Sequence, residues 1–182
     1  MTRYVAFLRA INVGGHTVKM ADLKRLFEEL GFTNVETFIA SGNVIFDSPG
    51  RSAAILEGKI EAHLQTALGY EVATFLRTVP EVAQAAAHKP FAADETGTRE
   101  TLYITFLRAE PAADLQHKLM AFRNAVDDFH TNGREVYWLR RGEPSESTFS
   151  GAQLERTLRC QGTARNVTTV RKIAEKYRGD GH

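Results

Sequence analysis

The sequence lacks the features of a disulfide-bonded or membrane-spanning protein. Cys160 is the only cysteine among 182 residues, which excludes an intrachain disulfide and a zinc cluster of several thiolates. No apolar run approaches the roughly 20 residues that a transmembrane helix needs. The first residues show no signal-peptide pattern and run directly into a strand-like segment. We therefore predict a cytoplasmic protein that does not bind membranes.

An excess of charge of one sign is also missing. The chain has 23 basic and 22 acidic side chains, for a formal net charge of +1. This balance gives no global argument for binding nucleic acid or a membrane surface. The charge is uneven, however, because residues 134–178 hold ten Lys and Arg against five Asp and Glu. A solvated helical face is the common reason for such a segment, and a nucleic-acid-binding surface is the alternative.

Hydrophobic patterning predicts the order β-α-β-β-α-β for the first half. Residues 3–10 are too few for a helix and are rich in aromatic and aliphatic side chains, which indicates a strand. Helices are predicted over residues 20–30 and 55–68, because each has apolar residues at helical spacing and is followed by a glycine. Further strands are predicted at residues 35–39, 44–46 and 72–76. Gly42-Asn43 is predicted to form a two-residue hairpin turn.

The second half repeats the first. Residues 103–109 match residues 4–10 at five of seven positions, and such a match indicates a repeated supersecondary unit. A helix is predicted from the spacing of Leu115, Leu119, Phe122 and Val126. A hairpin is predicted around Asn132-Gly133, and two more helices are predicted at residues 153–158 and 167–177.

These patterns predict an α+β protein of two tandem ferredoxin-like (split βαβ) subdomains. The sheets are expected to be antiparallel or mixed, with helices packed on them. We place the first subdomain at residues 1–79, the second, with its C-terminal helices, at 80–178, and a tail at 179–182. Because helices cover only one face of such a sheet, the other face needs a cover or a role.

Three ordered blocks resemble the DUF1697 family. They are FLRAINVGG at residues 7–15, followed by Met20 and Leu23; SGNV at residues 41–44; and TARN at residues 163–166, followed by TTV. The resemblance spans essentially the whole chain and implies a two-subdomain α+β fold, but no reaction, because the family is one of uncharacterised proteins. The late block of the family usually reads Arg-Asn-Trp-Asn-Thr, whereas this chain has Val167 and Thr168. A ligand contact made by that tryptophan or second asparagine would be lost here.

The loop after the first strand offers candidate binding groups. They are Arg9, Asn12, the backbone amides of Gly14 and Gly15, and Lys19. A glycine-containing loop that leads into a helix presents N–H groups to an anion. The loop has neither the Walker A nor the G-x-G-x-x-G spacing, so an ordinary strand-to-helix turn is the alternative.

Two later segments add further candidates. Ser41 and Asn43 flank the predicted hairpin turn, and turn chemistry is sufficient to explain them. Arg165, Asn166 and Thr168 lie where the last helix is expected to begin. Asn166 is a good N-cap, but an arginine there opposes the helix dipole. Either a carboxylate partner or an anionic ligand would explain Arg165.

No arrangement for catalysis is recognisable. Ala40-Ser41-Gly42 lacks the first glycine of the G-x-S-x-G elbow. Asp128 and His130 share one face of a predicted strand, but two ligands do not define a metal site. The remaining histidines lack metal-ligand spacing, and the RNP1 pattern of RNA-binding sheets is absent. We expect no metal and no cofactor.

The leading hypothesis is a binding module for a small anionic ligand that carries a phosphate or carboxylate. The first alternative is a nucleic-acid-associated protein that uses basic residues near the C-terminus, namely Arg140, Arg141, Arg156, Arg159, Arg165, Arg171 and Lys172. The second alternative is an enzyme whose site is not recognisable. The sequence leaves the oligomeric state open.

Overall fold

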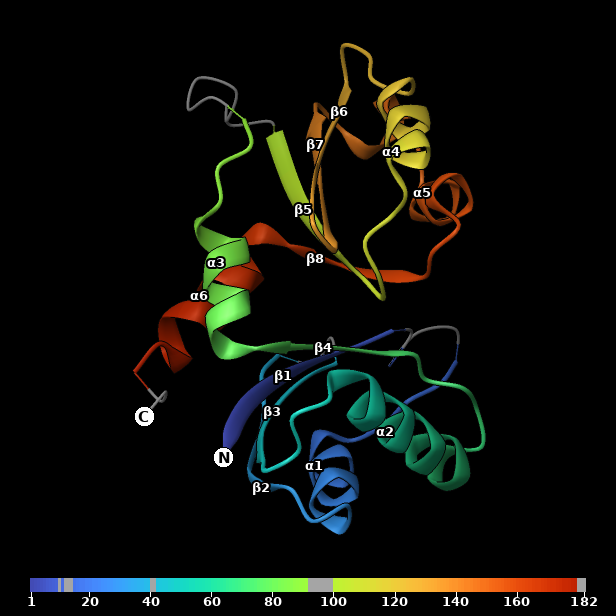
Figure 1. Ribbon diagram of the computed structural model, residues 1–182. Helices are drawn as coiled ribbons and strands as arrows, with labels where there is room; N and C mark the ends of the chain where they lie inside the picture. Colours follow the sequence, from blue (N-terminus) through green and yellow to red (C-terminus); the bar gives the residue numbers. More distant parts are fainter. Residues whose placement is uncertain (10, 12–14, 40–41, 92–99, 180–182) are drawn as a thin grey trace. The chain divides into compact units, whose positions relative to one another are not determined.

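The computed structural model describes residues 1–9, 11, 15–39, 42–91 and 100–179 (Figure 1). The chain divides into two compact units. The first comprises Met1–Ala83 together with the residues from Ile173 onward, and the second comprises Gln84–Lys172. The boundaries fall within two helices, α3 (Val79–Ala87) and α6 (Val167–Tyr177).

The first unit is built on a four-stranded antiparallel sheet in the order β2-β3-β1-β4. Its elements are β1 (Thr2–Leu8), α1 (Met20–Glu29), β2 (Thr33–Thr37), β3 (Asn43–Ser48), α2 (Ala53–Leu68) and β4 (Thr74–Thr78). Both α1 and α2 cover the same face of the sheet (Figure 1). This is the predicted ferredoxin-like arrangement.

The core of the first unit follows from the alternation of side chains along β1. Tyr4, Ala6 and Leu8 join the cluster formed with the apolar faces of α1 and α2, and the intervening Val5 and Phe7 are also buried. Both faces of β1 are therefore apolar, which explains its nearly continuous hydrophobic sequence.

One residue of α2 was placed incorrectly by the sequence pattern. Ile55, the first residue of the helix predicted over residues 55–68, was counted among its regularly spaced apolar residues, but its side chain is 72% exposed. The buried apolar residues of α2 are Leu56, Ile60 and Leu64, which are spaced four residues apart. Because successive helical residues are rotated by about 100°, Ile55 lies off the face that these residues share.

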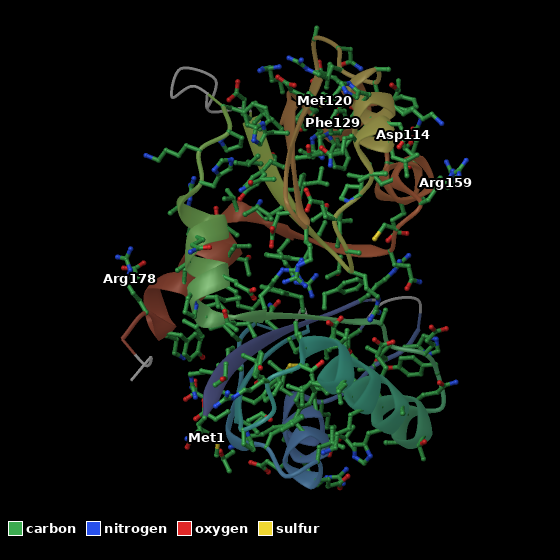
Figure 2. The ribbon with its side chains drawn as sticks, viewed as in Figure 1. Met1, Asp114, Met120, Phe129, Arg159 and Arg178 are labelled. Atoms are coloured by element: carbon green, nitrogen blue, oxygen red, sulfur yellow. The ribbon has the colours of Figure 1, made fainter. Side chains whose placement is uncertain are left out.

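The second unit repeats the topology, with an antiparallel sheet in the order β6-β7-β5-β8. Its elements are β5 (Glu100–Leu107), α4 (Ala113–Met120), β6 (Asp127–Asn132), β7 (Glu135–Arg141), the 3₁₀ helix η2 (Pro144–Glu146), α5 (Gly151–Leu158) and β8 (Gly162–Asn166). Phe129 of β6 and Met120 of α4 meet in the core on the helix-covered side of the sheet (Figure 2). The predicted repeat is confirmed at the level of the fold.

Strand β8 was not predicted. Its sequence, Gly-Thr-Ala-Arg-Asn, has no apolar alternation. The strand pairs antiparallel with β5, so that Arg165 lies opposite Ile104. Its backbone approaches β5 closely at Gly162, where a Cβ atom would lie 2.7 Å from the side chain of Thr105. The neighbouring strand, rather than the pattern of β8 itself, thus stabilises this segment.

Helix α4 is shorter than predicted. Phe122 and Val126 were expected to continue it, but it ends at Met120. The side-chain oxygen of Asn124 accepts hydrogen bonds from the N–H groups of Val126 and Asp127 at 2.7 and 2.8 Å. This turn competes with the helical hydrogen bonds. Phe122 instead packs against Phe149, with the ring centroids 5.4 Å apart.

The last turn of α6 is attached to the first unit through Tyr177. The Tyr177 side chain is only 2% exposed, and its hydroxyl donates a hydrogen bond to Oε2 of Glu36 at 2.7 Å. The guanidinium of Arg3 lies 5.3 Å from the centre of the tyrosine ring. The hydroxyl therefore bonds to a charged group, and the ring is buried against the Arg3 guanidinium.

We predict that Tyr177→Phe lowers the free energy of unfolding by about 1–2 kcal/mol, because it removes one hydrogen bond to a charged group and keeps the ring. Urea denaturation measures this change. Tyr177→Phe combined with Glu36→Ala should cost less than the sum of the two single changes, since both remove the same interaction. A Tyr177→Phe protein with the unfolding midpoint of the wild type would contradict the prediction.

Candidate functional site

The described part of the N-terminal loop places three of the predicted site residues. Arg9 is partly exposed, and its backbone N–H donates to the carbonyl of Ala73 at 2.9 Å. Gly15 is exposed with a φ of +84°, a conformation that favours glycine over residues with a Cβ. Lys19 is exposed at the N-cap position of α1 and makes no side-chain capping bond. Asn12 and Gly14 lie outside the described residues.

Lys19 lines an open hollow of about 570 Å³ in the first unit, between the start of α1 and the end of α2. The hollow also contains Asp22, Arg25 and Glu29. Nη1 of Arg25 lies 2.7 Å from a carboxylate oxygen of Glu29, and Nη2 lies 3.8 Å from a carboxylate oxygen of Asp22. Because carboxylates already neutralise Arg25, the hollow does not favour an anion.

Asn43 is a strand residue rather than a turn residue. It is fully buried, its side-chain amide donates to the carbonyl of Phe38 at 2.9 Å, and its own carbonyl accepts from the Phe38 N–H at 2.9 Å. The predicted two-residue turn at Gly42-Asn43 is therefore wrong. Asn43 belongs to β3 and pairs with Phe38, so the connection between β2 and β3 is longer than two residues. Ser41 lies outside the described residues.

Arg165 and Asn166 extend from opposite faces of β8, as consecutive residues of a strand do. Arg165 is only 8% exposed, and its Nη1 donates to Oγ1 of Thr163 at 2.8 Å and to the Ala164 carbonyl at 2.9 Å. Burial lowers the pKa of Arg165 to about 10, so the guanidinium remains protonated at neutral pH. The predicted helix start is correct for Asn166, whose side-chain oxygen accepts from the Thr168 N–H at 2.9 Å.

The repeat supplies a counterpart of Arg165 that sequence reasoning missed. Arg77 pairs with Val5 in the first sheet as Arg165 pairs with Ile104 in the second. Arg77 is 1% exposed, and its Nη1 also donates to the carbonyl of the preceding residue, Leu76, at 2.9 Å. The signal was present in the sequence, since an arginine, a polar residue and a valine occur in order at residues 77–79 and 165–167. The burial of Arg165 is thus a repeated feature of the fold.

A pocket of about 240 Å³ lies within the second unit, where β8 passes into α6. We call it the α6 pocket, and its lining residues are Glu100, Thr101, Leu102, Leu139, Asn166, Val167, Thr168 and Arg171. Leu102 and Leu139 face each other across β5 and β7 and supply apolar surface. Two of the predicted site residues, Asn166 and Thr168, therefore belong to one pocket.

The α6 pocket combines a positive and a negative group. Arg171 is exposed and lies one turn beyond Thr168 on the same side of α6. The N-terminus of a helix also carries a partial positive charge. On the β5 side, Oε1 of Glu100 lies 3.7 Å from Nε of Arg141, and Nη2 of that arginine lies 3.7 Å from Oδ2 of Asp128. The pocket thus offers a cation, a hydroxyl group, an amide and a carboxylate.

The basic residues near the C-terminus do not all form one surface. Arg165 is buried, Arg141 pairs with two carboxylates, and the guanidinium of Arg140 lies 5.5 Å from the centre of the Tyr103 ring. The remaining members, Arg156, Arg159, Arg171 and Lys172, are exposed. Internal contacts therefore reduce the basic surface that the sequence indicated.

Two negative findings apply to the described part of the chain. There, no group of three or more His, Cys, Asp or Glu side chains is placed to hold a metal ion. Likewise, no helix in these described segments is long and apolar enough to cross a membrane.

The order of strands and helices defines an α+β protein of two ferredoxin-like units. The chain belongs to the family described as "Protein of unknown function (DUF1697)", which matches residues 1–137. That match ends before the late block at residues 163–170. The conserved bacterial protein SP0830 from Streptococcus pneumoniae has a similar structure, with a TM-score of 0.76 and 22% sequence identity over 98% of this chain and 99% of that chain. At this identity the similarity shows the fold alone. No curated protein matches the sequence.

We predict that Asn43→Ala lowers the free energy of unfolding by about 1–3 kcal/mol, because it leaves the Phe38 carbonyl without its side-chain donor in a buried position. Chemical denaturation measures the loss. Unchanged stability would show that the amide has no structural role and would return Asn43 to the candidate ligand-binding residues.

We predict that Asn166→Ala lowers the free energy of unfolding by about 1 kcal/mol, the usual effect of removing an N-cap side chain. Asn166→Asp keeps an acceptor for the Thr168 N–H and should retain the stability of the wild type. If both substitutions destabilise the protein equally in thermal and urea unfolding, the side chain does not act as a cap.

Proposed function

We propose that the protein is a binding module for a small anionic ligand that carries a phosphate or carboxylate, and that the α6 pocket binds it. The observation that supports this proposal is the grouping of Asn166, Thr168 and Arg171 around one pocket at the start of α6. Helix α6 has eleven residues, long enough for its aligned peptide dipoles to favour an anion at its N-terminus.

The lining residues have complementary roles in this proposal. The guanidinium of Arg171 would bind the anionic group through two parallel N–H donors, a geometry that suits both phosphate and carboxylate. The hydroxyl of Thr168 would donate a further hydrogen bond. Leu102 and Leu139 would contact the apolar part of the ligand.

Glu100 restricts the class of ligand that the α6 pocket can bind. Although Arg141 partly neutralises Glu100, the carboxylate still accepts hydrogen bonds, so the ligand should present a hydroxyl or amine group to it. The volume of about 240 Å³ is below the range of about 300–1,000 Å³ that is usual for drug-sized ligands. A sugar phosphate or a hydroxylated carboxylic acid fits these requirements better than a nucleotide does.

Thermal unfolding in the presence of sugar phosphates, hydroxy acids, dicarboxylates and nucleotides tests the proposal. A ligand at a hundredfold excess over its Kd stabilises the native state by about 2.7 kcal/mol. We expect the stabilisation to be lost in Arg171→Gln and retained in Lys172→Gln. Both substitutions remove one positive charge from neighbouring exposed positions of α6, but only Arg171 lines the pocket.

Asn166→Asp provides a second test in the same assay. It keeps the helix cap but adds a negative charge to the pocket, so it should weaken binding of the anion without lowering the stability of the free protein. Stabilisation that is equal in all variants would contradict the proposed site. Binding that both charge removals weaken equally and that falls steeply with salt would instead favour the nucleic-acid alternative.

A further inference from the structure

Two histidines that are far apart in the sequence meet within the second unit. His88 is the first residue after α3, and His130 belongs to β6. Their Nε2 atoms are 3.2 Å apart, and both side chains are partly exposed. Nothing in the α6 pocket involves this pair, and sequence spacing could not reveal it, because 42 positions separate the two residues.

The separation of the two nitrogens fits a shared metal ion. Two imidazole nitrogens bound at about 2.0–2.1 Å to one tetrahedral ion lie about 3.3 Å apart. The observed 3.2 Å also fits a single N–H···N hydrogen bond. The separation of the two nitrogens therefore suits an ion, which would lie to one side of the line that joins them and would require the rings to turn toward it.

Asp128 lies two residues before His130 on β6, but arginines engage its carboxylate. Its oxygens lie 2.6 Å from Nε of Arg123 and 3.7 Å from Nη2 of Arg141. Asp128 is therefore not counted among the ligands of the proposed site.

The ring of Tyr137 packs against both imidazoles. Its centroid lies 5.2 Å from that of His88 and 6.2 Å from that of His130. The Tyr137 hydroxyl donates to the carbonyl of Ala85 at 2.7 Å, which links β7 to α3 just before His88. Tyr137 thus positions the two histidines and does not itself bind the ion.

We propose that His88 and His130 form a binding site for a divalent transition-metal ion that prefers imidazole ligands, such as Zn²⁺ or Ni²⁺. Since no third His, Cys, Asp or Glu side chain among the described residues completes the site, water or an anion would occupy the remaining coordination positions. With two protein ligands instead of the three of a catalytic zinc site, the pair would bind the ion more weakly and would leave the other positions open to an exogenous ligand.

Calorimetric titration of the full, untagged chain with ZnCl₂ and with NiCl₂ at neutral pH tests the proposal. We expect one ion per chain, and His88→Gln and His130→Gln should each weaken binding by at least about tenfold. His117→Gln, at an exposed position of α4, removes one histidine away from the pair and should bind as the wild type does. Absence of binding at millimolar metal, or equal binding in all four proteins, would overturn the proposal.

Two further measurements separate the site from a general effect on folding. Circular dichroism and Tm of the metal-free variants check the fold; if His130→Gln alters it, His88→Ala, at a partly exposed position directly after α3, takes its place. With the wild type, Co²⁺ should produce the visible absorption of a low-symmetry nitrogen site. That absorption should fade as the pH falls through the imidazole range, because protons compete with the metal. Co²⁺ absorption that persists in the histidine variants would overturn the site.

Discussion

The pairing of β8 with β5 is the interaction on which the second unit and its pocket depend. Because β8 is extended, Arg165 extends to one face of the strand and is buried, while Asn166 extends to the other and caps α6. Helix α6 therefore begins immediately beside the sheet, and its first turn forms one side of the α6 pocket. A loop in place of β8 would not place consecutive side chains on opposite faces, and it would not fix the position at which α6 begins.

The first unit also has a strand that passes directly into a helix, but the capping hydrogen bonds at this junction are different. Strand β4 passes directly into α3, as β8 passes into α6. There Thr78 is the cap, its hydroxyl accepting from the Glu81 N–H at 3.3 Å, while the Glu81 carboxylate accepts from the Thr78 N–H at 2.8 Å. This reciprocal capping box satisfies two backbone donors with the protein's own groups. At the second junction a single asparagine cap is combined with the exposed Arg171, and this combination makes the second junction the better candidate for binding an anion.

The chemical features of the second unit all come from segments that are distant in the sequence. Glu100 and Arg171 meet at the α6 pocket, and His88 and His130 meet beside Tyr137. The two arrangements differ in character: the pocket offers one cation and one carboxylate for a polar metabolite, whereas the histidine pair offers neutral nitrogen ligands for a metal ion. Family membership and the similar solved structure establish the fold, so arguments about function must start from these two groups of residues.

The sequence by itself determined the elements with strong periodicity and local capping chemistry. Strand β1, helix α2 with Leu56, Ile60 and Leu64 on its buried face, helix α6 over Val167–Tyr177 and the cap at Asn166 all follow from patterns within a few residues, although the same pattern placed Ile55 incorrectly. Only the tertiary structure decided that residues 162–166 form strand β8, that Arg165 and its counterpart Arg77 are buried, and that His88 contacts His130. Strand β8 carries no apolar alternation of its own and is stabilised by hydrogen bonds to β5, while the sites join residues that only the paired strands bring together. These contacts are non-local, and no local pattern of side chains encodes them.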